Sequence, residues 1–253
     1  MKRIALILEN PLNKGDMAVV ISTVETLKTI IPNSQISVFS SSPQGIDKYK
    51  NHSINFTKSP WKTKAETIFI NLIMSGLKCI SIIGMYTANF LLKPFGIAGF
   101  RDPLDYDLFI ENGTDIHTYG GMSFYYSLYP LLLNMLFRKP LVIYAESLGP
   151  FKNNMERSLM KFILNRASLI TIRESISYAF LQELKLKNSA YLTADPAFLL
   201  KSCCQERVDK IFIEEGINDI RKPVIGIFVS ELICRRAFGN HVKPKERRRK
   251  YFR

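Results

Sequence analysis

Residues 3–200 alternate between short apolar runs and longer amphipathic stretches. Residues 3–8 are apolar and end in turn-forming residues, which is typical of a buried parallel strand. Residues 17–31 carry apolar side chains at helical spacing, and Pro32 ends this predicted helix. Residues 35–39 then alternate as a second strand. A strand, helix and strand in this order predict a right-handed crossover in a parallel sheet.

The same alternation predicts further strand and helix pairs. Ser175 is expected to cap one of the helices, and Phe162 is expected to be buried on another. The repeated units predict an α/β fold, a Rossmann-like doubly wound parallel sheet. The predicted strands cover residues 107–110, 141–145, 169–172 and 190–193, and the predicted helices cover 123–137, 156–165 and 176–184.

The segment from Ile68 to Leu92 is almost entirely apolar, and Lys78 is its only charged residue. Three interpretations remain open. The segment forms buried or lobe-covering helices inside the domain, or it lies on a membrane surface between its basic flanks. The segment is also long enough to span a bilayer. A span, however, would place the strands before and after the segment on opposite sides of the membrane, and these strands must share one sheet.

The remaining chain predicts the beginning of a second domain. A helix is expected near residues 208–215, and residues 223–230 read as a strand. Residues 235–253 hold nine Lys or Arg and one Glu and show no periodicity, so we expect this tail to lack stable packing. The predicted domains are therefore 1–205, 206–234 and 235–253, the last being a basic tail after a truncated second lobe.

Composition narrows the function classes. The chain has 253 residues, 47% of them hydrophobic and 23% charged, which is typical of a folded protein. The net charge is +13, but the tail accounts for most of it, so we expect no specific nucleic-acid partner. The mildly basic body suits anionic small molecules or an anionic membrane face. The scattered cysteines predict no metal site and a cytoplasmic protein with reduced thiols.

Ligands of open α/β sheets bind outside the carboxyl ends of the strands. The loops that follow the predicted strands concentrate glycine, amide, carboxylate and guanidinium groups. They are residues 13–16, 112–115, 146–151, 173–174 and 195–196. No Walker sequence, dinucleotide fingerprint or nucleophile elbow occurs in the chain.

The first two loops have a binding and a purely structural interpretation. Gly15 lets backbone N–H groups approach an anion at the start of a helix. Asp16 is either a binding residue or simply the cap of that helix. Asn112 and Gly113 form a flexible loop after a strand, which turn chemistry explains equally well.

The later loops carry the same ambiguity. The Ser147 hydroxyl could bind a sugar. Arg173 is placed at a strand end as a fork for a phosphate or carboxylate, but it could equally pair with a carboxylate of a neighbouring loop. Asp195, before Pro196, could be only a turn former.

Taken together and in order, these segments resemble the polysaccharide pyruvyl transferase family. Four motifs carry the resemblance, and two departures accompany it: Asn112-Gly-Thr stands where the family has a glycine-rich loop, and Glu146 stands where many members have Gln. The motifs are Asn13-Lys-Gly-Asp-Met-Ala18, Tyr144-Ala-Glu-Ser-Leu-Gly-Pro-Phe151, Ile172-Arg-Glu174 with Ser177 and Leu181, and Thr193-Ala-Asp-Pro-Ala-Phe198.

The resemblance implies one lobe of a GT-B-like architecture of two lobes. It implies an enzyme of exopolysaccharide biosynthesis that transfers a pyruvyl group from phosphoenolpyruvate, without a further cofactor, to a saccharide of the cell envelope. That saccharide is often lipid-linked, which would bring the protein to the inner face of the membrane. Asp16, Gly15, Asn112, Gly113, Ser147 and Arg173 are the candidate substrate-binding residues, and no catalytic residue is assigned. Because most of the second lobe is missing, this chain is expected to be truncated and inactive alone. The alternatives are a GT-B glycosyltransferase that uses a nucleotide sugar, and a remnant without activity.

Overall fold

The computed structural model describes residues 1–8, 13–40, 54–58, 105–112, 122–136, 138–151, 153–217 and 225. The chain divides into two compact units, Met1–Leu200 and Lys201–Arg253. The first unit holds the sheet and all of the candidate residues. In the second unit, the structure describes a helix, α7 (Gln205–Glu214), close to the helix expected near residues 208–215.

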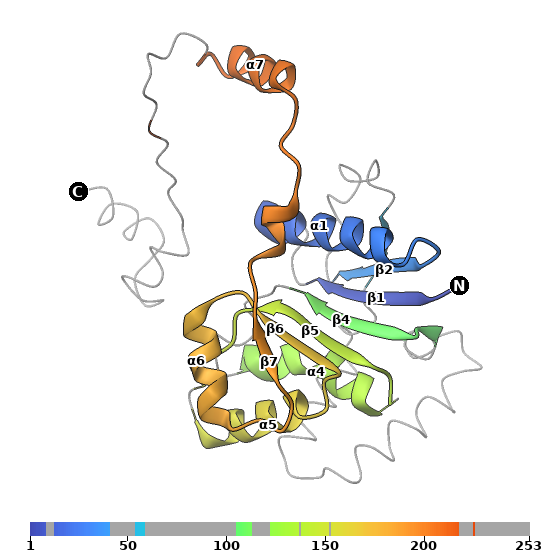
Figure 1. Ribbon diagram of the computed structural model, residues 1–253, viewed down its shortest axis with the longest axis vertical. Coiled ribbons are helices and arrows are strands. Elements are labelled where there is room, and N and C mark those ends of the chain that lie inside the picture. Colours follow the sequence, from blue (N-terminus) through green and yellow to red (C-terminus); the bar gives the residue numbers. More distant parts are fainter. Residues whose placement is uncertain are drawn as a thin grey trace. The chain divides into compact units, whose positions relative to one another are not determined.

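In the part of the first unit that the structure describes, seven parallel strands form a single sheet, which confirms the predicted fold class. The strand order is β3-β2-β1-β4-β5-β6-β7, so the chain builds outwards in one direction and then in the other from β1 (Figure 1). The strands are β1 (Arg3–Leu8), β2 (Gln35–Ser40), β3 (Asn55–Lys58), β4 (Leu108–Asn112), β5 (Leu141–Glu146), β6 (Leu169–Ile172) and β7 (Ala190–Leu192).

Helices cover both faces of this sheet. The side chains of α1 pack with one set of strand residues, including Leu6 and Val38. Helices α4, α5 and α6 share a second core with Phe109 and Ile143. Because strand side chains alternate between faces, adjacent residues such as Phe109 and Ile110 belong to different cores. The helices that the structure describes in this unit are α1 (Lys14–Ile30), α4 (Met122–Leu136), α5 (Asn154–Leu164), α6 (Ser175–Leu184) and the short 3-10 helix η5 (Pro196–Leu199).

Two local predictions are wrong. Ser175 is the first residue of α6 rather than its cap, because Glu174 occupies the N-cap position and makes no side-chain cap. Phe162 is 45% exposed, since the buried stripe of α5 runs through Met160, Ile163 and Leu164. The exposed ring instead lies under the guanidinium of Arg166, 3.8 Å from the ring centroid.

The structure adds elements that the hydrophobic pattern does not reveal. Strand β3 spans four residues at the sheet edge, and η5 is a single turn that begins at Pro196. Both are too short for a periodicity to develop.

The apolar segment 68–92 and the tail 235–253 lie outside the described residues, as does all of the strand expected at 223–230 except Ile225. None of the helices described here combines the length and the apolar character that a membrane crossing requires.

Candidate functional site

The candidate loops lie at one edge of the sheet. Every pairing between neighbouring strands is parallel, so all of the carboxyl ends meet at the same edge. Asp16 follows β1, Asn112 ends β4, Ser147 follows β5 and Arg173 follows β6. The prediction that these four residues lie at one edge of the sheet is therefore confirmed. Gly113 lies outside the described residues.

The strand order reverses between β1 and β4, which is the position where open sheets form a crevice. Asn112 lies there, 2% exposed, and its Oδ1 accepts a hydrogen bond of 3.0 Å from the Thr23 hydroxyl of α1. Its Nδ2 has no hydrogen-bond partner among the described residues. A buried amide donor at a strand end is a group that a ligand can satisfy.

The start of α1 is closed by Asn13, not by Asp16. Asn13 is the N-cap, and its Oδ1 accepts the Gly15 N–H at 2.9 Å. A Cβ on Gly15 would approach that oxygen to 3.3 Å, so glycine serves the cap here. Asp16 lies in the first turn, where its negative charge interacts favourably with the helix dipole. The interpretation of Asp16 as the cap of this helix is therefore wrong.

The end of β5 departs from regular strand geometry. Ala145 has a φ of 51°, and the pairing with β6 shifts register between Ile143 and Glu146. The Ala145 N–H donates to the Thr171 hydroxyl at 2.7 Å, which holds this conformation. A residue other than glycine in the left-handed region costs about 1 kcal/mol or more. Such bulges re-aim side chains and gather next to binding sites.

This bulge aims Ser147 at Arg173. The Arg173 Nε donates to the Ser147 Oγ at 2.8 Å, and its Nη1 lies 3.2 Å from the Asp195 Oδ2. The Arg173 side chain is 18% exposed, and that of Asp195 is 30% exposed. The loops after β5, β6 and β7 therefore meet at one guanidinium. The alternative ion pair that the sequence left open is present, with Asp195 as its carboxylate.

A second hydrogen-bonded chain fixes the loop after β5. The buried Ser177 hydroxyl donates to the Glu174 Oε1 at 2.7 Å and accepts the Leu148 N–H at 2.9 Å. Gly149 follows with a φ of 80°, packed against Phe180. The loop that carries Ser147 is thus attached to the first turn of α6.

Asp195 also organises the loop after β7. Its Oδ1 accepts the Ala197 N–H at 2.8 Å and so caps η5. The carbonyl of Pro196, the first residue of η5, accepts a hydrogen bond from the Ser22 hydroxyl of α1. Sequence reasoning missed the roles of Ser22 and Thr23, although polar residues on the buried face of an apolar helix are a signal for such contacts.

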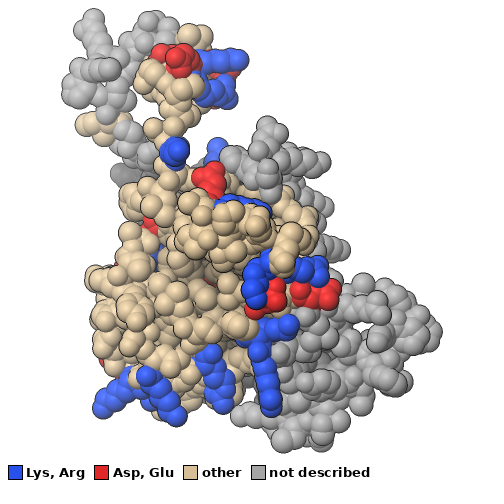
Figure 2. Space-filling model, turned by 45° about the vertical axis from the view of Figure 1, so that its right-hand side comes forward, with Lys and Arg blue, Asp and Glu red and all other residues tan. Residues whose placement is uncertain are grey.

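Charge is unevenly distributed over the surface. Figure 2 shows Lys and Arg side chains along the lower end of the view and a largely uncharged face above them. Burial raises the pKa of the Tyr144 hydroxyl on β5, which stays protonated at neutral pH.

Within the described part of the chain, no three His, Cys, Asp or Glu side chains are grouped as a metal site.

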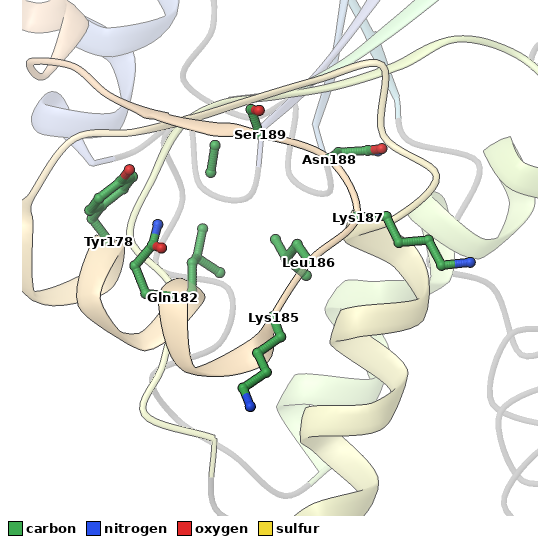
Figure 3. Close-up of a pocket in the computed structure, with 9 residues that line it drawn as sticks. Tyr178, Gln182, Lys185, Leu186, Lys187, Asn188 and Ser189 are labelled. Atoms are coloured by element: carbon green, nitrogen blue, oxygen red, sulfur yellow. The ribbon is translucent and has the colours of Figure 1, made fainter.

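A pocket of about 340 Å³ lies at the other end of the sheet. Its lining residues come from α6 and from the connection to β7, at the amino ends of the strands. In Figure 3 the side chains of Lys185 and Lys187 extend away from the space that Tyr178, Gln182 and Ser189 surround. The pocket contains none of the candidate residues, so we place the candidate site at the carboxyl edge, where a guanidinium, a hydroxyl and an amide donor are held.

Comparisons with known proteins concern the family and the fold of the chain. Residues 13–243 match the family model described as polysaccharide pyruvyl transferase. The amylovoran biosynthesis protein AmsJ of Erwinia amylovora is 24% identical over 198 residues, which are 75% of this chain and 47% of that protein. The chain thus spans less than half of the length of this relative.

A glycosyltransferase from Rickettsia africae has a similar fold. The TM-score is 0.50 at 10% identity, and the match covers 96% of this chain and 58% of that structure. This likeness concerns the fold alone. The family match, by contrast, includes every loop that meets at Arg173, and it shows that the chain belongs to the polysaccharide pyruvyl transferase family.

Proposed function

We propose that the protein acts in the transfer of a pyruvyl group from phosphoenolpyruvate to a saccharide, which forms a cyclic ketal. Family membership supports the reaction class. The observation that carries the proposal is the Arg173 guanidinium, held by Ser147 and Asp195 at the carboxyl edge of the sheet. A planar guanidinium with fixed orientation is suited to a carboxylate or a phosphate, and phosphoenolpyruvate has both.

The transfer requires that two sugar hydroxyl oxygens bond to C2 of the enolpyruvyl group. The methylene carbon gains a proton and becomes a methyl group, and the bond from C2 to the phosphate oxygen breaks. The two hydroxyl protons are balanced by that methyl proton and by the proton that inorganic phosphate carries away. The reaction needs cations at the carboxylate and at the phosphate, and an acid beside the methylene carbon.

Arg173 supplies one of these cations in the proposal. The Ser147 hydroxyl keeps the guanidinium plane fixed through Nε, and the Asn112 Nδ2 offers a neutral donor nearer to α1. The loop of Gly15 and Asp16, at the start of α1, faces the acceptor. A preorganised donor of this kind is typically worth about a hundredfold or more in rate.

The acceptor is proposed to be a unit of a cell-surface polysaccharide, carried on a lipid. The relative from Erwinia amylovora is named for the biosynthesis of amylovoran, which fits this class of acceptor. A lipid-linked acceptor would bring the protein to the inner face of the cell membrane.

Calorimetric titration of the purified chain with phosphoenolpyruvate tests the proposal. We expect binding that Arg173→Ala abolishes. The matched control is Arg157→Ala, because Arg157 forms a comparable but exposed ion pair with Glu183. Binding of a nucleotide sugar without binding of phosphoenolpyruvate would favour the glycosyltransferase alternative. Equal binding by the Arg173→Ala variant would contradict the assigned site.

A further inference from the structure

The two carboxylate oxygens of Asp195 have different tasks. Oδ1 accepts the Ala197 N–H at 2.8 Å and caps η5, whereas Oδ2 faces the Arg173 Nη1 at 3.2 Å. The ion pair and the cap therefore use separate atoms. Losing the contact at Oδ2 does not require the loss of the cap at Oδ1.

We infer that Asp195 is an internal competitor that stands in for the oxyanion of the ligand at Arg173. This inference rests on the proposed function, in which Arg173 binds a carboxylate or phosphate of the donor. An incoming oxyanion replaces the Asp195 Oδ2 at Nη1, while Ser147 retains Nε and Asp195 retains the cap of η5.

The geometry supports an exchange of partners rather than a permanent ion pair. The Arg173 side chain is the less exposed of the two, at 18%, and its Nε is held independently by Ser147. The Asp195 side chain is 30% exposed, so its carboxylate can be rehydrated when the pair opens. A partly exposed pair at 3.2 Å is worth little enough for a charged ligand to replace it.

The competition makes Asp195 a determinant of specificity. A neutral ligand gains too little at Nη1 to replace a carboxylate, whereas an anion restores the charge balance when it takes that position. Asp195 therefore lowers the affinity for every anion and excludes uncharged sugar hydroxyls from the guanidinium.

Asp195→Asn tests this inference, because asparagine retains an oxygen that can cap η5 and removes the negative charge. We expect the dissociation constant for phosphoenolpyruvate, measured by calorimetry on the full chain, to fall about tenfold. Removing one negative charge roughly 5 Å from a bound anion, in a partly exposed site, changes the affinity by about this factor. Glu183→Gln is the matched control, since Glu183 pairs with an arginine at 3.5 Å on an exposed surface, and it should leave the constant unchanged.

Titrations with inorganic phosphate and with pyruvate identify the end of the donor that contacts Arg173. The probe that gains more affinity in Asp195→Asn carries the group that contacts Arg173, and a gain for either probe supports the inference. If Asp195→Asn does not fold, Asp195→Ser offers a second capping side chain without charge. Unchanged or weaker phosphoenolpyruvate binding by a folded variant overturns the inference. If the wild-type chain binds no phosphoenolpyruvate, or if Arg173→Ala binds it unchanged, the proposed function fails instead.

Discussion

The two edges of the sheet use their polar side chains in different ways. At the amino edge, side chains mainly bond to the backbone: Asn188 donates to the carbonyls of Leu164 and Ala167, and the Asn165 Oδ1 accepts the Lys187 N–H. At the carboxyl edge, side chains also bond to the backbone, but in addition side chains from separate loops bond to each other. The contacts between Ser147 and Arg173 and between Arg173 and Asp195 are of this second kind.

The difference indicates which edge can bind a ligand. A side chain that closes a turn has a permanent partner, and a ligand that displaced it would also open the turn. A side chain that bonds to another side chain can exchange that partner for a ligand without opening a turn. The open pocket is thus at the edge that serves structure, and the exchangeable groups are at the edge that carries the candidate site.

The largest contrast is expected from side chains at left-handed backbone positions. Gly149 has a φ of 80°, and the Cβ that Gly149→Ala adds would lie 2.9 Å from the Phe180 ring. We therefore expect the free energy of unfolding to fall by about 3 kcal/mol. Lys185, at the amino edge, already has a side chain at a φ of 49°. Lys185→Gly should leave the free energy of unfolding unchanged or raise it by up to about 1 kcal/mol. Urea unfolding measures the free energy of unfolding of both variants. Equal changes in the two variants would contradict the predicted difference between the two edges.

A smaller contrast is expected from the removal of one polar side chain at each edge. Ser177→Ala leaves the buried Leu148 N–H without its acceptor, at a cost of about 2 kcal/mol. Asn188 itself is exposed, so in Asn188→Ala a water molecule can take the place of its amide, and a loss of about 1 kcal/mol is expected. Thermal unfolding of the two variants checks the order, and a greater loss in Asn188→Ala would reverse it.

The two ion pairs give a third, weaker contrast in the absence of ligand. Asp195→Asn should lower the free energy of unfolding by about 1 kcal/mol, and Glu183→Gln by less than about 0.5 kcal/mol, because the first pair is the more buried. Added salt should reduce the second effect more than the first. A less stable Asp195→Asn variant that binds anions more tightly would sharpen the comparison, since a purely structural residue would not give both results.

The smallest effect concerns Asp107, which precedes β4 at the amino edge. The Arg3 N–H donates to its carboxylate at 2.8 Å and holds the pKa of Asp107 below its usual value of 3.8. A lowered folded-state pKa adds stability above the unfolded-state pKa, and this stability is lost as the pH falls through the folded value. Asp107→Asn should therefore be slightly less stable than the wild type at neutral pH, and the difference should shrink on acidification below the usual value. Unfolding curves measured across that range check the sign.

The sequence by itself determined the fold class and which loops form the candidate site. Apolar runs such as residues 141–145 pack against a hydrophobic core on both faces of a parallel sheet, so composition alone marks them. Parallel strands then bring the residues that follow them to one edge, which is why Ser147 and Arg173 could be grouped before any contact was known.

Only the tertiary structure decided what those residues do to one another. Asp195 is distant from Ser147 in the chain, and nothing in the spacing states that both contact the same guanidinium. The choice of Asn13 over Asp16 as the helix cap depended on backbone dihedral angles, and the exposure of Phe162 depended on which stripe of α5 met the core. Periodicity reports burial averaged over an element, whereas a partner is selected by distance and direction between individual atoms.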